Sequence, residues 1–336
     1  MRLNDLICDG VIFQANKPIR IFGTGGGSVE IELCSNTYSG IEVGTEWCAE
    51  LPPMDYGGPY ELKITLDGRE RIIKDVYIGD VYILAGQSNL QFKLKESDYP
   101  AELYATDPLL RFFHNERPEQ SESFFPQDGW VDARADRDGG FSCIGYFVGT
   151  YLRKMTNRAV GFITCYQGAA NIQAYLPDIA FENPLFNIPD EERRDDYPWN
   201  KGHSQLYNFQ VKKTAPFSAA GIIWYQGESN ASARESEVYG DMLLCLINSW
   251  RTAFKDDRLP FTVVQLPDFL NCDVESWKKI QKAQAEIGAK APFVKTVISR
   301  DVCENTDIHP KHKYELSKRI AEAVFKYDEK MTESGY

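Results

Sequence analysis

The pattern of apolar residues changes character at about residue 76. Beyond that point, short apolar runs predict buried strands at residues 81–85, 159–165, 220–225, 261–266 and 293–298. Between them, apolar residues recur every three or four positions, which predicts helices at residues 235–254, 276–288 and 312–327. Strands that alternate with helices predict a parallel sheet, whose ligands bind beyond the carboxyl ends of the strands.

One helical segment carries an apolar stripe that repeats every four residues. Its members are Val238, Met242, Leu246, Trp250 and Phe254. Because residues at this spacing share one face of a helix, they predict a face packed in the core rather than a cofactor-binding box.

The first 75 residues follow a different pattern. Short alternating runs at residues 11–13, 19–22, 29–33 and 60–64 are separated by Gly, Pro, Asn and Asp. This alternation predicts a small all-β, sandwich-like domain at residues 1–75, ahead of an α/β domain at residues 76–336. The glycine-rich segment 23–28 is followed by a strand, unlike a phosphate-binding loop, and we expect it to form a hairpin turn.

Composition and charge exclude several classes of protein. The 336 residues are 43% hydrophobic and 26% charged, and no apolar run approaches the roughly 20 residues that a membrane span needs. A net charge of −12 argues against nucleic acid or an anionic membrane as a partner. The opening residues lack the apolar core of a secretory signal, so we expect a cytoplasmic protein, or an extracellular or periplasmic one if a leader has been removed.

The cysteines and histidines point away from disulfides and metals. The eight cysteines are scattered without a Cys-x-x-Cys pair, which favours a reducing compartment over a disulfide framework. The four histidines are too dispersed for a zinc motif, so we expect no metal and no cofactor.

The residue types needed for nucleophilic hydrolysis lie near the two ends of the predicted sheet region. Ser88 follows the run 81–85 within Gly-Gln-Ser-Asn, and Asp307 and His309 lie two residues apart. A serine hydroxyl becomes nucleophilic when an imidazole takes its proton and a carboxylate orients that imidazole. These residues predict a serine hydrolase, although Gly-x-Ser is also common in turns, and Pro310 is expected in the first turn of a helix.

Two further strand ends carry groups that can stabilise an anionic oxygen. Gly168 follows the second predicted strand, and Gln226, Glu228 and Asn230 follow the third. Backbone N–H groups near glycine and side-chain amides are suitable oxyanion donors, although each residue alone could be an ordinary turn residue. We favour Glu228 as an orienter of this loop over an exposed carboxylate.

Taken together, these segments resemble the sialate O-acetylesterase-type carbohydrate esterases, a branch of the SGNH hydrolase superfamily. The matching segments are Gly79–Tyr82 leading to Gly86–Asn89, Trp224–Ala231, Trp250–Arg251, Leu259–Phe261 with Gln265–Leu266, and Asp307–Pro310. Segments within residues 9–23 and 51–60 resemble the β-domain that precedes the catalytic domain in these esterases. The resemblance therefore covers nearly the whole chain.

The resemblance implies a flavodoxin-like three-layer α/β/α hydrolase domain with Ser88 as nucleophile, His309 as base and Asp307 as the acid that orients it. It also implies an oxyanion hole. Its donors would be the N–H groups of Ser88 and Gly168 and one side-chain amide, from either Gln226 or Asn230. We expect Gln87 and Glu228 to hold these groups in position without contacting the substrate themselves.

The chain departs from the wider superfamily in its acid. The superfamily commonly places the acid three residues before the histidine, where this chain has Thr306, whereas this branch often has the shorter Asp-x-His. An α/β-hydrolase is the nearest rival, but its Gly-x-Ser-x-Gly elbow would need glycine at Leu90.

The expected substrate is a small acetylated sugar or oligosaccharide, above all O-acetylated sialic acid, cleaved through an acyl-serine. The alternatives are an esterase for acetylated xylan or another glycan, and a catalytically inactive carbohydrate-binding protein. The sequence leaves open the sugar, the hydroxyl position and the oligomeric state.

Overall fold

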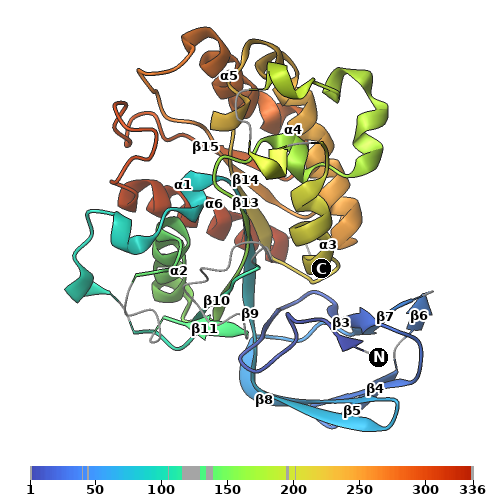
Figure 1. Cartoon of the computed structure of the whole chain (residues 1–336). Coiled ribbons are helices and arrows are strands. Elements are labelled where there is room, and N and C mark those ends of the chain that lie inside the picture. The colour runs from blue at the N-terminus through green and yellow to red at the C-terminus, as the bar shows by residue number, and fades with distance from the viewer. Residues whose placement is uncertain are drawn as a thin grey trace.

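The structure consists of a β-rich part that holds the N-terminus and a larger α/β part (Figure 1). It is a computed structural model that describes residues 2–39, 41–43, 45–104, 106–115, 129–133, 139–193, 197–200 and 202–333. One long strand, β9 (Arg69–Gly86), belongs to both parts. The boundary expected near residue 75 therefore falls inside a continuous strand rather than in a linker.

Two layers of mainly antiparallel strands form the N-terminal part. The first layer has the order β1 (Arg2–Leu3), β3 (Ile19–Thr24), β7 (Glu46–Leu51) and β6 (Ile41–Val43). The second contains β5 (Asn36–Ser39), β4 (Val29–Leu33), β8 (Gly57–Leu66), the first half of β9, and β2 (Ile12–Gln14), which runs parallel to β9. Burial alternates along β4 with period two, as in a strand with one face on a core.

The glycine-rich segment at residues 23–28 joins β3 to β4 but is not a hairpin turn. β3 pairs with β1 and β7, whereas β4 pairs with β5 and β8. The segment therefore carries the chain from one layer to the other. The hairpin prediction is wrong because alternation identifies strands without identifying their partners.

The α/β part is built on a mostly parallel sheet. Its order is β11 (Trp130–Asp132), β10 (Leu110–Phe113), β12 (Val160–Tyr166), β9, β13 (Gly221–Tyr225), β14 (Phe261–Val264) and β15 (Val294–Val297), with only β11 antiparallel. Every residue of β13 and β14 is buried, because helices cover both faces of the sheet.

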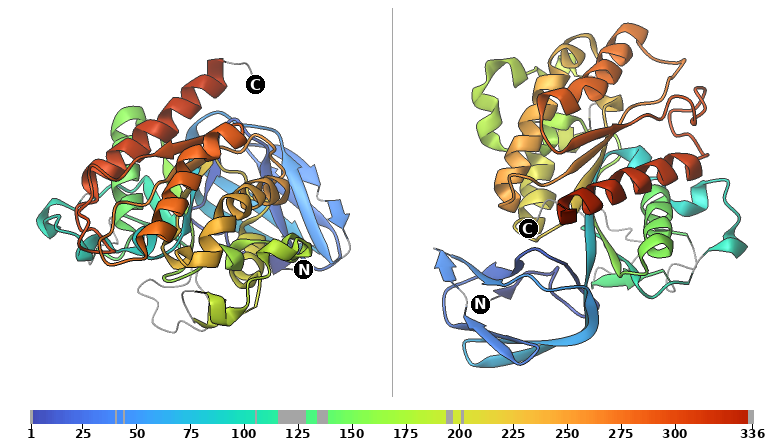
Figure 2. Two further views of the ribbon diagram at one scale, coloured as in Figure 1. Left: turned by 90° about the horizontal axis from the view of Figure 1, so that it is seen from above. Right: turned by 180° about the vertical axis from the view of Figure 1, so that it is seen from behind.

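Four long helices cover the sheet. α2 (Cys143–Thr156) packs against α6 (Tyr314–Glu333), and α4 (Ala233–Phe254) packs against α5 (Val274–Lys290), which gives three layers (Figure 2). Two helices are short, α1 (Ser88–Gln91) and α3 (Lys212–Thr214). The predicted stripe on α4 lies in the core, except that Val238 is only half-buried. The expected α/β fold class is confirmed.

The start of α6 differs from the expectation. The helix begins at Tyr314, four residues after Pro310, so the proline precedes the helix instead of lying in its first turn. The intervening residues form part of a loop that begins after β15 and carries Asp307 and His309.

β9 lies at the point where the sheet reverses its direction of growth. The chain leaves β9 for β10 and β12 on one side and then returns to β13 on the other. At such a switch point the loops that follow the strands diverge and leave a crevice. Gly86 ends β9 with a positive φ, and a Cβ there would lie 2.0 Å from the Tyr225 carbonyl oxygen, so glycine is required just before Ser88.

Among the described helices, none has both the length and the apolar character needed to cross a bilayer. All eight cysteines lie in the described part of the chain, and all are free thiols.

Candidate active site

The structure brings together Ser88 and His309, which are 221 residues apart in the sequence. Ser88 is the first residue of α1, at the carboxyl end of β9, and His309 lies in the loop between β15 and α6. The Oγ of Ser88 is 2.8 Å from Nε2 of His309, which is hydrogen-bond distance for two half-buried side chains. A proton can therefore pass directly from the hydroxyl to the imidazole.

The surroundings of His309 favour its neutral form. Burial lowers the pKa of the imidazole below its ordinary value of 6.5, and the nearby positive charge of Lys313 lowers it further. The carboxylates of Asp307 and Glu96 act in the opposite direction. Since the net pKa shift is downward, His309 is ready to accept a proton at neutral pH.

Asp307 contacts His309 through the backbone. One oxygen of its exposed carboxylate accepts a hydrogen bond from the His309 N–H at 2.9 Å. Among the contacts of the described residues, none joins this carboxylate to the imidazole Nδ1. The assignment of Asp307 as the orienting acid stays a prediction, with its negative charge beside the ring in support.

Gly168, after β12, lies beside the serine. A Cβ built on Gly168 would be 3.8 Å from the Ser88 Cβ. The Gly168 N–H donates to Oε1 of Gln91, three residues beyond Ser88, at 2.6 Å. An anionic oxygen that uses this N–H must take the place of the Gln91 oxygen.

The structure does not present the amides of Gln226 and Asn230 to Ser88. Both side chains are fully buried after β13. Asn230 Nδ2 donates to Gln173 and Glu235 at 2.7 and 3.0 Å, and Gln226 Nε2 lies 2.7 to 3.1 Å from three acceptors within the protein. Since each amide has only two N–H bonds, neither has a donor left for an oxyanion, and the prediction of a side-chain amide in the oxyanion hole is not supported by this geometry.

Gln87 and Glu228 connect the loops around Ser88 through hydrogen bonds, and their role in supporting the site stays a prediction. Oε1 of Gln87 accepts from the backbone N–H groups of Gly227 and Ser229 at 3.4 and 3.2 Å, which fixes the turn after β13 against α1. Oε1 of Glu228 accepts from the Asn89 side chain at 2.6 Å. Both side chains are buried, so these bonds are shielded from water.

Three residues near the site were not singled out from the sequence. Asn89 and Gln91 lie on α1 beside Ser88, and Lys313 is buried just before α6, with its Nζ 2.8 Å from Asn89 Oδ1. Asn89 belongs to the Gly-Gln-Ser-Asn block, which could have drawn attention to it. A lysine near a helix start reads as an exposed residue, so the sequence held no signal for Lys313.

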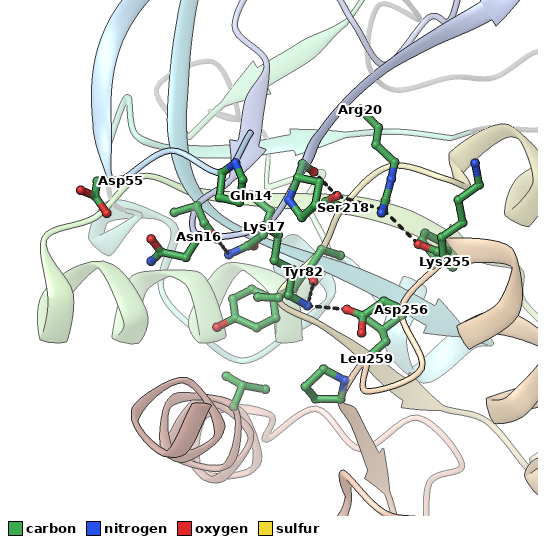
Figure 3. Close-up of a pocket in the computed structure, with 18 residues that line it drawn as sticks. Gln14, Asn16, Lys17, Arg20, Asp55, Tyr82, Ser218, Lys255, Asp256 and Leu259 are labelled. Carbon is green, nitrogen blue, oxygen red and sulfur yellow. Dashed lines mark hydrogen bonds and ion pairs between the residues drawn. The ribbon is translucent and has the colours of Figure 1, made fainter. Parts of the chain in front are cut away.

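A separate cavity of about 640 Å³ lies where the two parts of the chain meet (Figure 3). Asn16, Lys17 and Tyr82 contribute to its lining, and Lys17 Nζ donates to Asp256 Oδ2 at 2.7 Å. Its lining includes residues 218–220 and 259–260, which directly precede β13 and β14. Tyr82 lies four residues before the end of β9 at Gly86, about 13 Å at the rise of a strand, and Ser88 lies beyond that end, so this cavity is distinct from the serine–histidine site.

A serine–histidine pair at the switch point of a doubly wound sheet is the arrangement expected of a hydrolase with a serine nucleophile. Comparison with known families then identifies the family. The model described as "Carbohydrate esterase, sialic acid-specific acetylesterase" matches residues 78–326, so the chain belongs to this family. The protein is a sialate O-acetylesterase-like carbohydrate esterase.

Curated relatives and a solved structure agree with this family. The chain is 26% identical to the sialate O-acetylesterase of Rattus norvegicus, over 89% of this chain and 68% of the relative, and 25% identical to that of Homo sapiens, over 89% and 65%. It thus spans about two thirds of the length of these relatives. The crystal structure of a carbohydrate acetylesterase from Xanthomonas citri superposes with a TM-score of 0.83 at 26% identity, covering 96% of this chain and 74% of that one.

Proposed function

We propose that the protein removes O-acetyl groups from a carbohydrate, with O-acetylated sialic acid as its substrate, through an acyl-serine on Ser88. The observation that carries this proposal is the 2.8 Å contact between Ser88 Oγ and His309 Nε2. Membership of the sialic acid-specific acetylesterase family supports the choice of ester and sugar.

In the first half of the reaction, Ser88 Oγ attacks the carbonyl carbon of the acetyl ester while His309 Nε2 accepts the hydroxyl proton. The tetrahedral intermediate collapses when its bond to the sugar oxygen breaks. His309 gives the proton to that oxygen, and the sugar leaves as an alcohol. The acetyl group remains on Ser88.

In the second half, water attacks the acetyl-serine. His309 takes a proton from the water and returns it to Ser88 Oγ as the acyl bond breaks. Acetate leaves and the enzyme regains its starting state. The lowered pKa of His309 suits this role, because the base must be neutral at the start of each half.

The oxyanion of each tetrahedral intermediate needs fixed donors, and we assign this role to the backbone N–H groups of Ser88 and Gly168. The Gly168 N–H now donates to Gln91 Oε1, a neutral acceptor. An oxyanion accepts a stronger hydrogen bond than a neutral amide oxygen, so charge development favours replacement of the Gln91 oxygen.

The test is release of acetate from a substrate panel. O-acetylated sialic acids, acetylated xylo-oligosaccharides and p-nitrophenyl acetate are each offered to the wild-type protein and to Ser88→Ala. The proposal expects turnover by the wild type, highest on the sialic acids, and none above background by the variant. Preference for acetylated xylo-oligosaccharides would show that the substrate is an acetylated xylan and not a sialic acid. Activity retained by Ser88→Ala would contradict an acyl-serine on this residue. Sugar binding without turnover of any ester would indicate a binding protein.

A further inference from the structure

The side-chain amide of Asn89 connects the segment that carries the nucleophile with the segment that carries the base. Asn89 follows Ser88 directly, and its Nδ2 donates to the carbonyl oxygen of Ile308, the residue before His309, at 2.9 Å. The same Nδ2 donates to Glu228 Oε1 at 2.6 Å. The amide is thus one residue from each reacting side chain and connects to the loop after β13 as well.

Lys313 determines which way this amide faces. Its Nζ donates to Asn89 Oδ1 at 2.8 Å, so the oxygen end of the amide faces a cation and the nitrogen end faces a carboxylate and a carbonyl. The side chains of Asn89, Lys313 and Glu228 are each at most 2% exposed. With water excluded, the opposite orientation would place like partial charges together, so the amide is held in one orientation.

The ammonium group of Lys313 is held by more than one contact. It lies 4.7 Å from the centre of the Phe92 ring, a cation–π distance, and Phe92 directly follows α1. Burial lowers the pKa of Lys313, while Cys303, Cys143, Glu228 and Glu304 act on it in the opposite direction, and His309 is a further titratable group on which the charge of Lys313 acts. A buried lysine incurs a desolvation cost that a surface lysine avoids. We therefore infer that its charge has a function here.

We propose that Lys313 is a positioning residue for the esterase reaction, which acts through Asn89 to hold the His309 loop against α1 and through its charge to keep the imidazole unprotonated. This inference rests on the proposed function of Ser88 and His309. Burial is the main cause of the lowered pKa of His309, and the charge of Lys313 lowers it further while Asp307 and Glu96 raise it, so removal of that charge is expected to raise the pKa of His309.

The experiment measures kcat/KM for p-nitrophenyl acetate against pH in the wild type, Lys313→Met, Asn89→Ala and Lys311→Met. Methionine keeps the length of lysine without its charge. Lys311 is an exposed lysine on the same loop, so its variant controls for loss of one positive charge there. Thermal melting shows which variants are folded.

The proposal expects the acid limb of Lys313→Met to move to higher pH by about half a unit or more, because a nearby charge has been removed. It expects Asn89→Ala to lower the plateau of kcat/KM roughly 10- to 100-fold with little movement of the limb, because the charge stays while the positioning contact is lost. Lys311→Met should match the wild type in both respects. A purely structural role for Lys313 would lower activity without moving the limb.

The inference is overturned if folded Lys313→Met has the acid limb of the wild type, or if folded Asn89→Ala keeps a plateau within about twofold of it. Should Lys313→Met not fold because the buried carboxylate of Glu228 loses a nearby positive charge, the double variant Lys313→Met, Glu228→Gln removes both charges, and a limb shift in the same direction is required of it. Lack of turnover by the wild type would instead refute the proposed function, so the two failures are distinguishable.

Discussion

The segment that carries Ser88 and the segment that carries His309 are built in different ways. Ser88 is flanked by Gln87 and Asn89, which are buried and bonded to the loops after β13 and β15. His309 is half-buried, and Asp307 beside it is exposed. The nucleophile thus sits in a fixed frame, whereas the base lies on a surface loop whose position depends on a few buried contacts. The comparison teaches that the serine–histidine distance is controlled mainly from the histidine side.

Removal of either member of the pair should have the largest effect. Ser88→Ala and His309→Ala are each expected to lower kcat/KM by roughly 10⁴-fold or more, because neither residue works without the other. Hydrolysis of p-nitrophenyl acetate measures both. The double variant should be no worse than the single ones, and an additive loss would show that the two residues act independently.

Gln91→Glu should have the next largest effect. A carboxylate at this position would keep the bond to the Gly168 N–H and repel the developing oxyanion, so kcat is expected to fall roughly 10²- to 10³-fold. Gln91→Ala is the matched control, since it leaves the N–H open and should retain most of kcat. Equal values for the two variants would mean that Gly168 is not an oxyanion donor.

Asp307→Asn tests the histidine segment directly. A carboxylate that orients the imidazole through Nδ1 would cost roughly 10⁴-fold in kcat when replaced. The exposed position of Asp307 and its bond to the backbone N–H of His309 lead us to expect a smaller loss, about 10-fold, since asparagine can still accept that bond. Steady-state kinetics decide between the two sizes of effect, and a loss near the larger one would show that the loop rearranges during catalysis.

The smallest predicted effect concerns the pH dependence of kcat/KM. It is a displaced acid limb and not a loss of activity. The pKa of His309 is lowered, so its neutral form persists as the pH falls below 6.5, the ordinary value. The acid limb of kcat/KM for the wild type is therefore expected to have its midpoint below about 6.5. A midpoint above that value would contradict the lowered pKa of His309 in the free enzyme.

The sequence was sufficient for five strands of the α/β sheet, three of the four long helices and the candidate serine–histidine pair, but it did not predict the short strands β10 and β11. Strand ends followed by Gly, Ser or Asn mark the active edge of a parallel sheet, which is why Ser88 and Gly168 could be placed there. It was insufficient for α2, because that helix is buried on most sides. Gly145 and Gly149 pack against Leu84 and Leu110, so the apolar residues show no clear stripe.

The sequence was also insufficient to show whether the polar side chains of a short loop face the protein interior or the substrate. Residues 228–230 form a 3₁₀ turn that buries the amide of Asn230, whereas the motif alone fits an amide that faces the substrate equally well. Lys313 is a residue that the sequence places in solvent and the structure places in the interior. A charged residue beside a helix start is expected in solvent, and only the tertiary contacts with Asn89 and Phe92 reveal that it is buried.

The central claim is that His309 activates Ser88 to carry the acyl group, and the acyl-enzyme itself tests it most directly. The protein is mixed with p-nitrophenyl acetate, quenched in acid within milliseconds and digested for mass spectrometry. The account predicts one acetyl group on the peptide that contains Ser88, formed rapidly in the wild type and at a rate at least about 10³-fold lower in His309→Ala. Full turnover with no acetyl group on Ser88, or equally fast acetylation without His309, would contradict it.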